Sequence, residues 1–319
     1  MQCPNCNTSL LPDDRFCDNC GVPLMADSPS PTLACTNCGT SAIDAEGYCA
    51  QCGVRTVPGA SAVPKDRIEL AVSQRLAGVS DPGLKHDRNE DAIALQTVNP
   101  DQHILVVCDG VSSSQTPELA AQAAATATCQ SLAAALQGNE AAELVMKRSI
   151  TAALDAVCAV PYQAQEDRDP PSTTIVAAIV QATRVTIGWL GDSRAYWIGA
   201  HSIQPLTQDD SWLNDMVASG KLSEAEARQS PYAHAINRWL GADAKDDAVP
   251  SIFNFTVPGS GYLLLCSDGL WNYAPTPNQL AELVQRYTAP EAIVLSRRLV
   301  EYARSQGGRD NITVAILSF

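Results

Sequence analysis

Two apolar runs in the sequence end in the same way, on an aspartate followed by a glycine. Residues 103–108 lead into Asp109-Gly110, and residues 262–267 lead into Asp268-Gly269. A run of strand length without polar alternation predicts a strand that is buried on both faces. Because an isolated buried carboxylate is costly, the aspartate that ends such a strand should be paired, hydrogen-bonded or bound to metal. Either Asp-Gly could be an ordinary turn, but the two strand ends together suggest a metal site between paired strands.

A second set of candidate ligands lies near the start of the chain, where eight of the 12 cysteines fall within 52 residues. They form the pattern C-x2-C-x10-C-x2-C twice, 32 residues apart: Cys3, Cys6, Cys17 and Cys20, then Cys35, Cys38, Cys49 and Cys52. Two C-x2-C pairs complete one tetrahedral zinc site, so the repeat predicts two structural zinc ions. Disulfides and a redox pair are the alternatives, but a redox pair needs no second pair. The doubled spacing resembles the double zinc ribbon family over residues 1–53.

Composition limits the partners of the chain. Its 319 residues carry a net charge of -14, with a pI of about 4.6. That charge argues against a broad nucleic-acid surface and against an anionic membrane, so we expect neither as a partner. Only Arg15 and Arg55 are basic before Lys65, which favours a protein partner for the ribbons. The N-terminus lacks the features of a signal peptide, so we expect reduced cysteines and a cytoplasmic location.

Changes in composition predict the domain boundaries. Segments rich in proline and serine separate the two cysteine repeats and follow the second one, and they indicate extended or flexible spacers. The expected organisation is a zinc ribbon over 1–21, a second over 33–54, a linker over 55–66 and the main domain over 67–319.

Most of the main domain shows strand patterns joined by short turns. Strands are expected at 68–76, 92–97, 103–108, 173–180, 185–190, 195–198, 252–257, 262–266 and 312–317. Helices are expected at 117–137, 140–158, 277–287 and 290–305, with short helices between 210 and 240. Strands and helices do not alternate as in βαβ units, so the pattern suggests antiparallel sheets covered by helix pairs.

Five short motifs follow in order along residues 67–319, and together they resemble the metal-dependent PPM-type (type 2C) serine/threonine protein phosphatases. The motifs are Asn89-Glu90-Asp91, Asp109-Gly110, Gly191-Asp192-Ser193-Arg194, Ser267-Asp268-Gly269-Leu270 and Gly308-Arg309-Asp310-Asn311. The resemblance implies an α+β fold, a PPM-type antiparallel β-sandwich flanked by helix pairs (α-β-β-α) and preceded by the two ribbons. It also implies hydrolysis of phosphoserine and phosphothreonine on phosphorylated proteins by a water that two metal ions activate.

The resemblance assigns ligands to those ions, which oxygen ligands predict to be manganese or magnesium. Asp109 bridges the two ions and is central to catalysis, and Asp268 and Asp310 complete one site. The Gly110 carbonyl serves the other site, with Glu90 or Asp91. Two further aspartates, Asp192 and Asp169, occupy the positions of a third ion in bacterial members, and Asn311 is expected to orient a ligand. Without the resemblance, the loop at 87–91 could be solvated and the aspartates of the later motifs could serve turns.

The sequence departs from the family at two positions that bind the substrate phosphate or protonate the leaving group. His86 stands where members usually carry an arginine that clamps the substrate phosphate, with Arg88 nearby as a second candidate. Histidine is charged only part of the time near neutral pH, so we expect His86 to bind phosphate more weakly, and less as pH rises. Val111 stands where some members have a histidine that protonates the leaving group. The alternative to an active enzyme is a catalytically weak scaffold or regulatory binding protein.

Residues 211–240 correspond to the family's flap, a segment beside the active site. Trp212 and Trp239 within it could contact substrate, but burial in the core is the expected role of each.

Overall fold

The apolar run at 103–108 forms the strand β4 (Gln102–Asp109), and its side chains are buried on both faces, as predicted. Ile104 and Val106 belong to one apolar cluster, and Leu105 and Val107 belong to another on the opposite face. The computed structural model describes residues 66–319 except 139, 165–167, 201, 234 and 245–247. All of these belong to the unit Ser61–Phe319, the second of two units in the chain.

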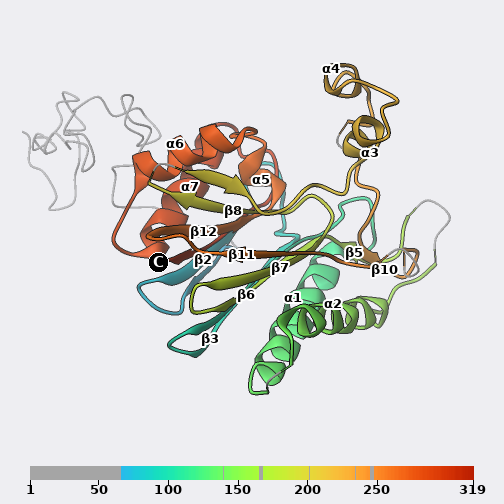
Figure 1. The fold of residues 1–319 in the computed structure, drawn as a ribbon. Coiled ribbons are helices and arrows are strands. Elements are labelled where there is room, and N and C mark those ends of the chain that lie inside the picture. The colour runs from blue at the N-terminus through green and yellow to red at the C-terminus, as the bar shows by residue number, and fades with distance from the viewer. Residues whose placement is uncertain (1–65, 139, 165–167, 201, 234, 245–247) are drawn as a thin grey trace, which may run out of the picture. The chain divides into compact units, whose positions relative to one another are not determined.

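Two antiparallel sheets form the centre of this unit (Figure 1). The five-stranded sheet has the order β11-β7-β6-β4-β3. Its other strands are β3 (Asp91–Asn99), β6 (Ile175–Gln181), β7 (Arg184–Leu190) and β11 (Ser251–Thr256). The six-stranded sheet has the order β1-β2-β13-β12-β8-β9. Its strands are β1 (Ile68–Ala71), β2 (Leu76–Asp81), β8 (Arg194–Gly199), β9 (Ile203–Pro205), β12 (Gly261–Cys266) and β13 (Ile312–Ser318). A short pair, β5 (Ser172–Thr173) and β10 (Leu240–Gly241), forms a separate two-stranded sheet.

Helices cover the outer face of each sheet (Figure 1). The five-stranded sheet packs against α1 (Pro117–Ala135) and α2 (Ala142–Cys158). The six-stranded sheet packs against α5 (Asp268–Trp271), α6 (Pro277–Tyr287) and α7 (Ala292–Ser305). A third apolar cluster fills the space between the sheets and includes Leu76, Leu105 and Leu263. The layers are therefore helix, sheet, sheet and helix, which confirms the predicted α-β-β-α architecture.

One predicted strand is wrong. The alternating residues 68–76 form a hairpin rather than a single strand, because the chain turns between β1 and β2. The Ser73 hydroxyl accepts hydrogen bonds from the backbone N–H groups of Arg75 and Leu76, at 3.2 and 3.0 Å. This serine turn interrupts the strand without disturbing the alternation of residue types that suggested it.

The segment 211–240 contains two short helices, α3 (Trp212–Ala218) and α4 (Glu224–Ala227), which extend away from the sandwich (Figure 1). Trp212 and Trp239 are only half-buried, so the expectation that they belong to the core is wrong. Trp212 packs against Tyr232 at 5.9 Å between ring centroids, and the Trp239 indole N–H donates to Asp243 Oδ1 at 3.2 Å. A segment that leaves the sandwich has too few neighbours to bury an indole.

The eight N-terminal cysteines lie outside the described residues. Within the described residues, no helix has both the length and the apolar character to cross a membrane.

Candidate active site

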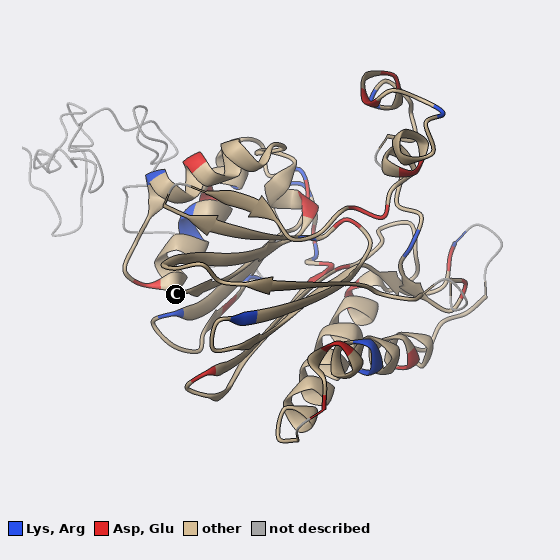
Figure 2. Cartoon of the chain, in the orientation of Figure 1, with Lys and Arg blue, Asp and Glu red and all other residues tan. Residues whose placement is uncertain are grey.

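The pairing of the strands brings the predicted acidic residues to one end of the sandwich. Asp91 begins β3 and lies directly opposite Asp109, the last residue of β4. Asp268 follows the end of β12, and Asp310 precedes the start of β13, the antiparallel partner of β12. Asp192 precedes β8, which pairs with β12 from the other side. Because antiparallel partners end and begin at the same edge, residues far apart in sequence become neighbours. Figure 2 shows acidic residues on the loops at this end of the strands.

Asp91 links the two sheets at this edge. Its Oδ2 accepts a hydrogen bond of 2.8 Å from Ser267 Oγ, which lies at the end of β12 in the opposite sheet. Asp91 Oδ1 is buried and has no hydrogen-bond partner among the described residues. A buried carboxylate oxygen without a partner costs free energy, and a cation bound at this oxygen would remove that cost.

Enclosure and mutual repulsion raise the pKa values of these carboxyl groups. Burial is the largest cause for Asp109, whose pKa lies well above its usual range, and neighbouring charges add to it. Those neighbours are Asp91, Asp268, Asp192 and Asp310. Burial raises the pKa of Asp91 to about 7, against the hydrogen bond from Ser267 that lowers it. Burial and then the charge of Asp310 raise the pKa of Asp268 to about 7.

Burial, and after it the neighbouring carboxylates, disfavour the charged form of these groups. No three carboxylate, imidazole or thiolate side chains of the described residues already stand in a metal-binding geometry. Hard oxygen donors in this number suit magnesium or manganese, and the donor set therefore fits the ions that the sequence suggests.

Hydroxyl groups that the sequence analysis missed hold the backbone of Asp109. The Asp109 carbonyl accepts from Thr174 N and from Thr173 Oγ1, both at 2.8 Å. Thr174 Oγ1 accepts from Asp109 N at 3.3 Å and also meets Ser193 Oγ at 2.9 Å. The only sequence signal was the run of serine and threonine at 172–174, which suggests nothing specific without the pairing of β4 and β6.

Gly110 cannot be replaced without a clash. A Cβ atom at this position would lie 2.7 Å from the carbonyl oxygens of Glu90 and Pro117. The Gly110 N–H donates to the Glu90 carbonyl at 3.1 Å, which brings the two motifs together. The Glu90 carboxylate is half-buried and accepts from Ser112 Oγ at 2.7 Å.

Asn311 joins the last motif to the first. Its Oδ1 accepts from Glu90 N at 2.6 Å, and its Nδ2 donates to the carbonyls of Pro82 and Arg88, both at 3.0 Å. The side chain therefore fixes the loop 82–90 that carries His86 and Glu90.

The turn that carries Asp192 is held by Arg194 and Trp271. Arg194 forms two hydrogen bonds with Asp209, at 2.8 and 2.7 Å, and its guanidinium stacks 3.6 Å from the ring of Trp271. The Trp271 indole N–H donates to the Asp192 carbonyl at 2.9 Å. Burial and then the charge of Asp268 raise the pKa of Asp192 to about 8. Asp169, the other residue proposed for a third ion, is exposed, and its backbone carbonyl accepts from Gln115 N.

The two candidates for phosphate binding lie in different surroundings. His86 Nε2 is 3.4 Å from Asp310 Oδ1, so this residue lies beside the carboxylate cluster. The side chain of Arg88 is 72% exposed and pairs with Glu118 on α1 at 3.3 Å.

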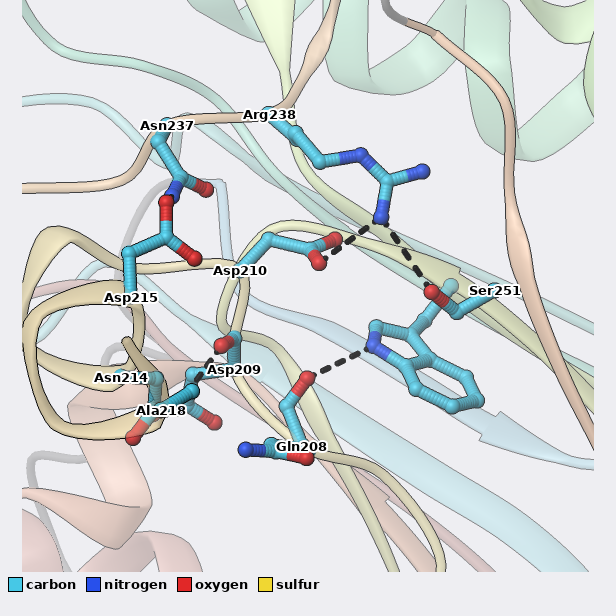
Figure 3. A pocket seen from close by; sticks show the side chains of 10 residues that line it. Gln208, Asp209, Asp210, Asn214, Asp215, Ala218, Asn237, Arg238 and Ser251 are labelled. Carbon is cyan, nitrogen blue, oxygen red and sulfur yellow. Dashed lines mark hydrogen bonds and ion pairs between the residues drawn. The ribbon is translucent and has the colours of Figure 1, made fainter. Parts of the chain in front are cut away.

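One pocket adjoins the cluster, and a second lies farther along the chain segment 208–238. One is lined by Asp192, Asp268, Gly269, Asn272, Tyr273, Gln306, Arg309 and Asp310. The other lies at the base of the flap and is drawn in Figure 3, where Arg238 bonds Asp210 at 2.9 Å and Ser251 at 3.2 Å. Asp210, which lines this pocket, also accepts a hydrogen bond of 3.1 Å from Gly191 N, next to Asp192.

Comparison with known proteins defines the class. Residues 85–302 match the family model for protein phosphatase 2C, and residues 3–53 match that for the double zinc ribbon. The chain therefore belongs to the protein phosphatase 2C family and carries a double zinc ribbon at its N-terminus.

Several relatives share this domain. The serine/threonine phosphatase stp of Listeria monocytogenes is 30% identical over 243 residues, which cover 75% of this chain and 93% of that protein. Among solved structures, the phosphatase Stp1 from Staphylococcus aureus matches with a TM-score of 0.65 and 26% identity, covering 81% of this chain and 99% of that one. The catalytic domain of the phosphatase PstP in complex with 2 manganese ions matches with a TM-score of 0.62 and 26% identity, covering 76% and 97%.

Proposed function

We propose that this chain hydrolyses phosphoserine and phosphothreonine on proteins in a reaction that depends on manganese or magnesium. One observation carries the proposal: carboxylates from distant parts of the chain crowd at one end of the sandwich, with their pKa values raised and one buried oxygen unpartnered. The names of the relatives and the manganese ions in one solved neighbour support it.

Two divalent cations bound here would neutralise phosphate charge and activate water as a nucleophile at neutral pH. Asp109 would bridge them, Asp268 and Asp310 would complete one position, and the Gly110 carbonyl with Glu90 or Asp91 would serve the other. Asp192 and Asp169 would hold a third ion.

The protein's own residues prepare this arrangement. Thr173 and Thr174 hold the backbone of Asp109, which limits the positions that its carboxylate can take. Asn311 fixes the loop that carries His86 and Glu90. Val111 has no proton to donate, so either water protonates the leaving alkoxide or the reaction is slower.

The eight N-terminal cysteines would hold two structural zinc ions, within ribbons at 1–21 and 33–54 that the linker 55–66 joins to the domain at 67–319. With few basic residues, the ribbons are better suited to recruiting or recognising a protein than a nucleic acid. The proposed location is the cytoplasm, where reducing conditions would keep these cysteines as thiols.

The test is hydrolysis of a phosphoserine peptide by the full chain, with and without manganese. We expect metal-dependent turnover that Asp109→Asn reduces by about 100-fold or more, because one bridging ligand serves both ions. Asp155→Asn, a matched change at an exposed position of α2, should leave the rate unchanged. A wild-type chain that binds metal without turnover would contradict the proposal and favour the scaffold.

A further inference from the structure

Arg309 lies between Gly308 and Asp310 and lines the same pocket as Asp192 and Asp268. Its side chain is exposed, and its guanidinium has no ion pair or hydrogen bond within the described part of the chain. Three carboxylates line this pocket, so the absence of a pair is not due to a lack of acidic neighbours. An unpaired guanidinium beside a carboxylate cluster is available to an anionic ligand.

The backbone of Arg309 is held from two sides. Its N–H donates to the hydroxyl of Tyr273 at 2.9 Å. The preceding Gly308, at φ 47°, accepts from Leu84 N at 2.7 Å and donates to Ala303 O at 3.1 Å. The loop is therefore anchored to the end of α7 and to the loop of His86. Only the side chain of Arg309 has freedom to move toward a ligand.

Three other basic groups near the cluster are already engaged. His86 Nε2 is 3.4 Å from Asp310 Oδ1, and Arg88 is paired with Glu118. Arg194 is held in two hydrogen bonds by Asp209. Among these four side chains, Arg309 alone presents unsatisfied donors to the pocket.

We infer that Arg309 binds the phosphate group of the substrate and takes over the task of the arginine that position 86 lacks. This inference rests on the proposed function. A guanidinium offers two parallel N–H donors that match two oxygens of a phosphate, a geometry that an imidazole cannot provide. Phosphate oxygens bound at the side of Asp268 and Asp310 would lie at the wall of the pocket that Arg309 shares with these residues.

The test compares Arg309→Gln and Arg309→Lys with the wild-type full chain at saturating manganese. With p-nitrophenyl phosphate, Arg309→Gln should raise KM and the inhibition constant of inorganic phosphate by about tenfold, as expected for loss of a charged hydrogen bond at an exposed site. The value of kcat should stay within about twofold, and Arg309→Lys should recover part of the loss because it keeps the charge.

Arg184→Gln is the matched control. Arg184 is an exposed arginine at the start of β7, the opposite end of that strand from the Asp192 turn, and we expect wild-type constants. Calorimetric titration of inorganic phosphate in the presence of magnesium adds a measurement that does not depend on turnover, and Arg309→Gln should weaken this binding by the same factor.

Unchanged KM and phosphate affinity in Arg309→Gln would overturn the inference. So would a change confined to the apparent affinity for manganese, because it would place Arg309 with the metal ligands instead of the substrate. A wild-type chain without manganese-dependent turnover would refute the proposed function, and the phosphate titration would still decide the role of Arg309.

Discussion

A buried ionic cluster at the base of the His86 loop should be a main support of the domain. Asp81 ends β2 with its side chain 0% exposed, and it pairs with Arg67 at 2.9 Å and with Arg304. Asp81 Oδ1 also accepts from Gly83 N at 2.8 Å, where the chain enters the loop with φ at 74°. The variant Asp81→Asn keeps the shape of this side chain but removes its charge.

The expected loss of unfolding free energy depends on which charged partners Arg67 and Arg304 keep. Removing one partner of a buried ion pair typically costs about 3–5 kcal/mol, because the other charge stays buried and uncompensated. The side chains of Arg67 and Arg304 are only 9% and 14% exposed, but Glu301 still lies 2.7 Å from Arg67 and 3.6 Å from Arg304. We therefore expect the lower end of that range, about 3 kcal/mol of unfolding free energy.

Urea unfolding followed by tryptophan fluorescence measures this quantity, since all five tryptophans lie between residues 189 and 271 and report on the phosphatase domain. Glu224→Gln is the control: its partner Arg228 and Glu224 itself are more than half exposed, so the loss should stay below about 1 kcal/mol. A loss of less than 1 kcal/mol in Asp81→Asn would refute the view that this cluster is tightly buried and interdependent.

Three further changes test the carboxylate site. Thr174→Val removes the hydroxyl that accepts from Asp109 N and should lower kcat about fivefold, because a net hydrogen bond contributes about 1 kcal/mol. Thr174→Ser keeps the hydroxyl and should restore kcat. Equal kcat values for the two variants in steady-state kinetics would show that the hydroxyl is irrelevant. Gly110→Ala places a methyl group against two carbonyl oxygens and should reduce the unfolding free energy by about 1–3 kcal/mol in urea, whereas a neutral result would mean that the turn can open. The folded-state pKa values of Asp91 and Asp268, both about 7, lie above the ordinary value of 3.8, so the metal-free folded state binds more protons than the unfolded state between these values. The stability of chelator-treated protein should therefore fall as pH rises from about 4 to about 7, and a thermal-unfolding series in which stability rises over this range would contradict the raised values.

Local sequence patterns determined much of the fold. The apolar runs before Asp109 and Asp268 form strands buried as expected, because a strand covered on both faces has no reason to alternate. The helix expected at 277–287 has these bounds, with Thr276 as its N-cap and proline in its first turn. Such signals lie within a few residues of the element they specify, so a single sequence is enough to predict these helices and strands.

The tertiary structure alone decided how the ends of these elements support one another. Arg67 and Glu301 are 234 positions apart, and no periodicity predicts that they meet over Asp81. The same holds for Thr174, which supports Asp109 only because β4 and β6 are neighbours, and for Arg309, whose unpaired state depends on which carboxylates face it. Periodicity identifies the face that an element buries, whereas contacts between distant side chains depend on sheet order and register, which emerge only when the whole domain packs.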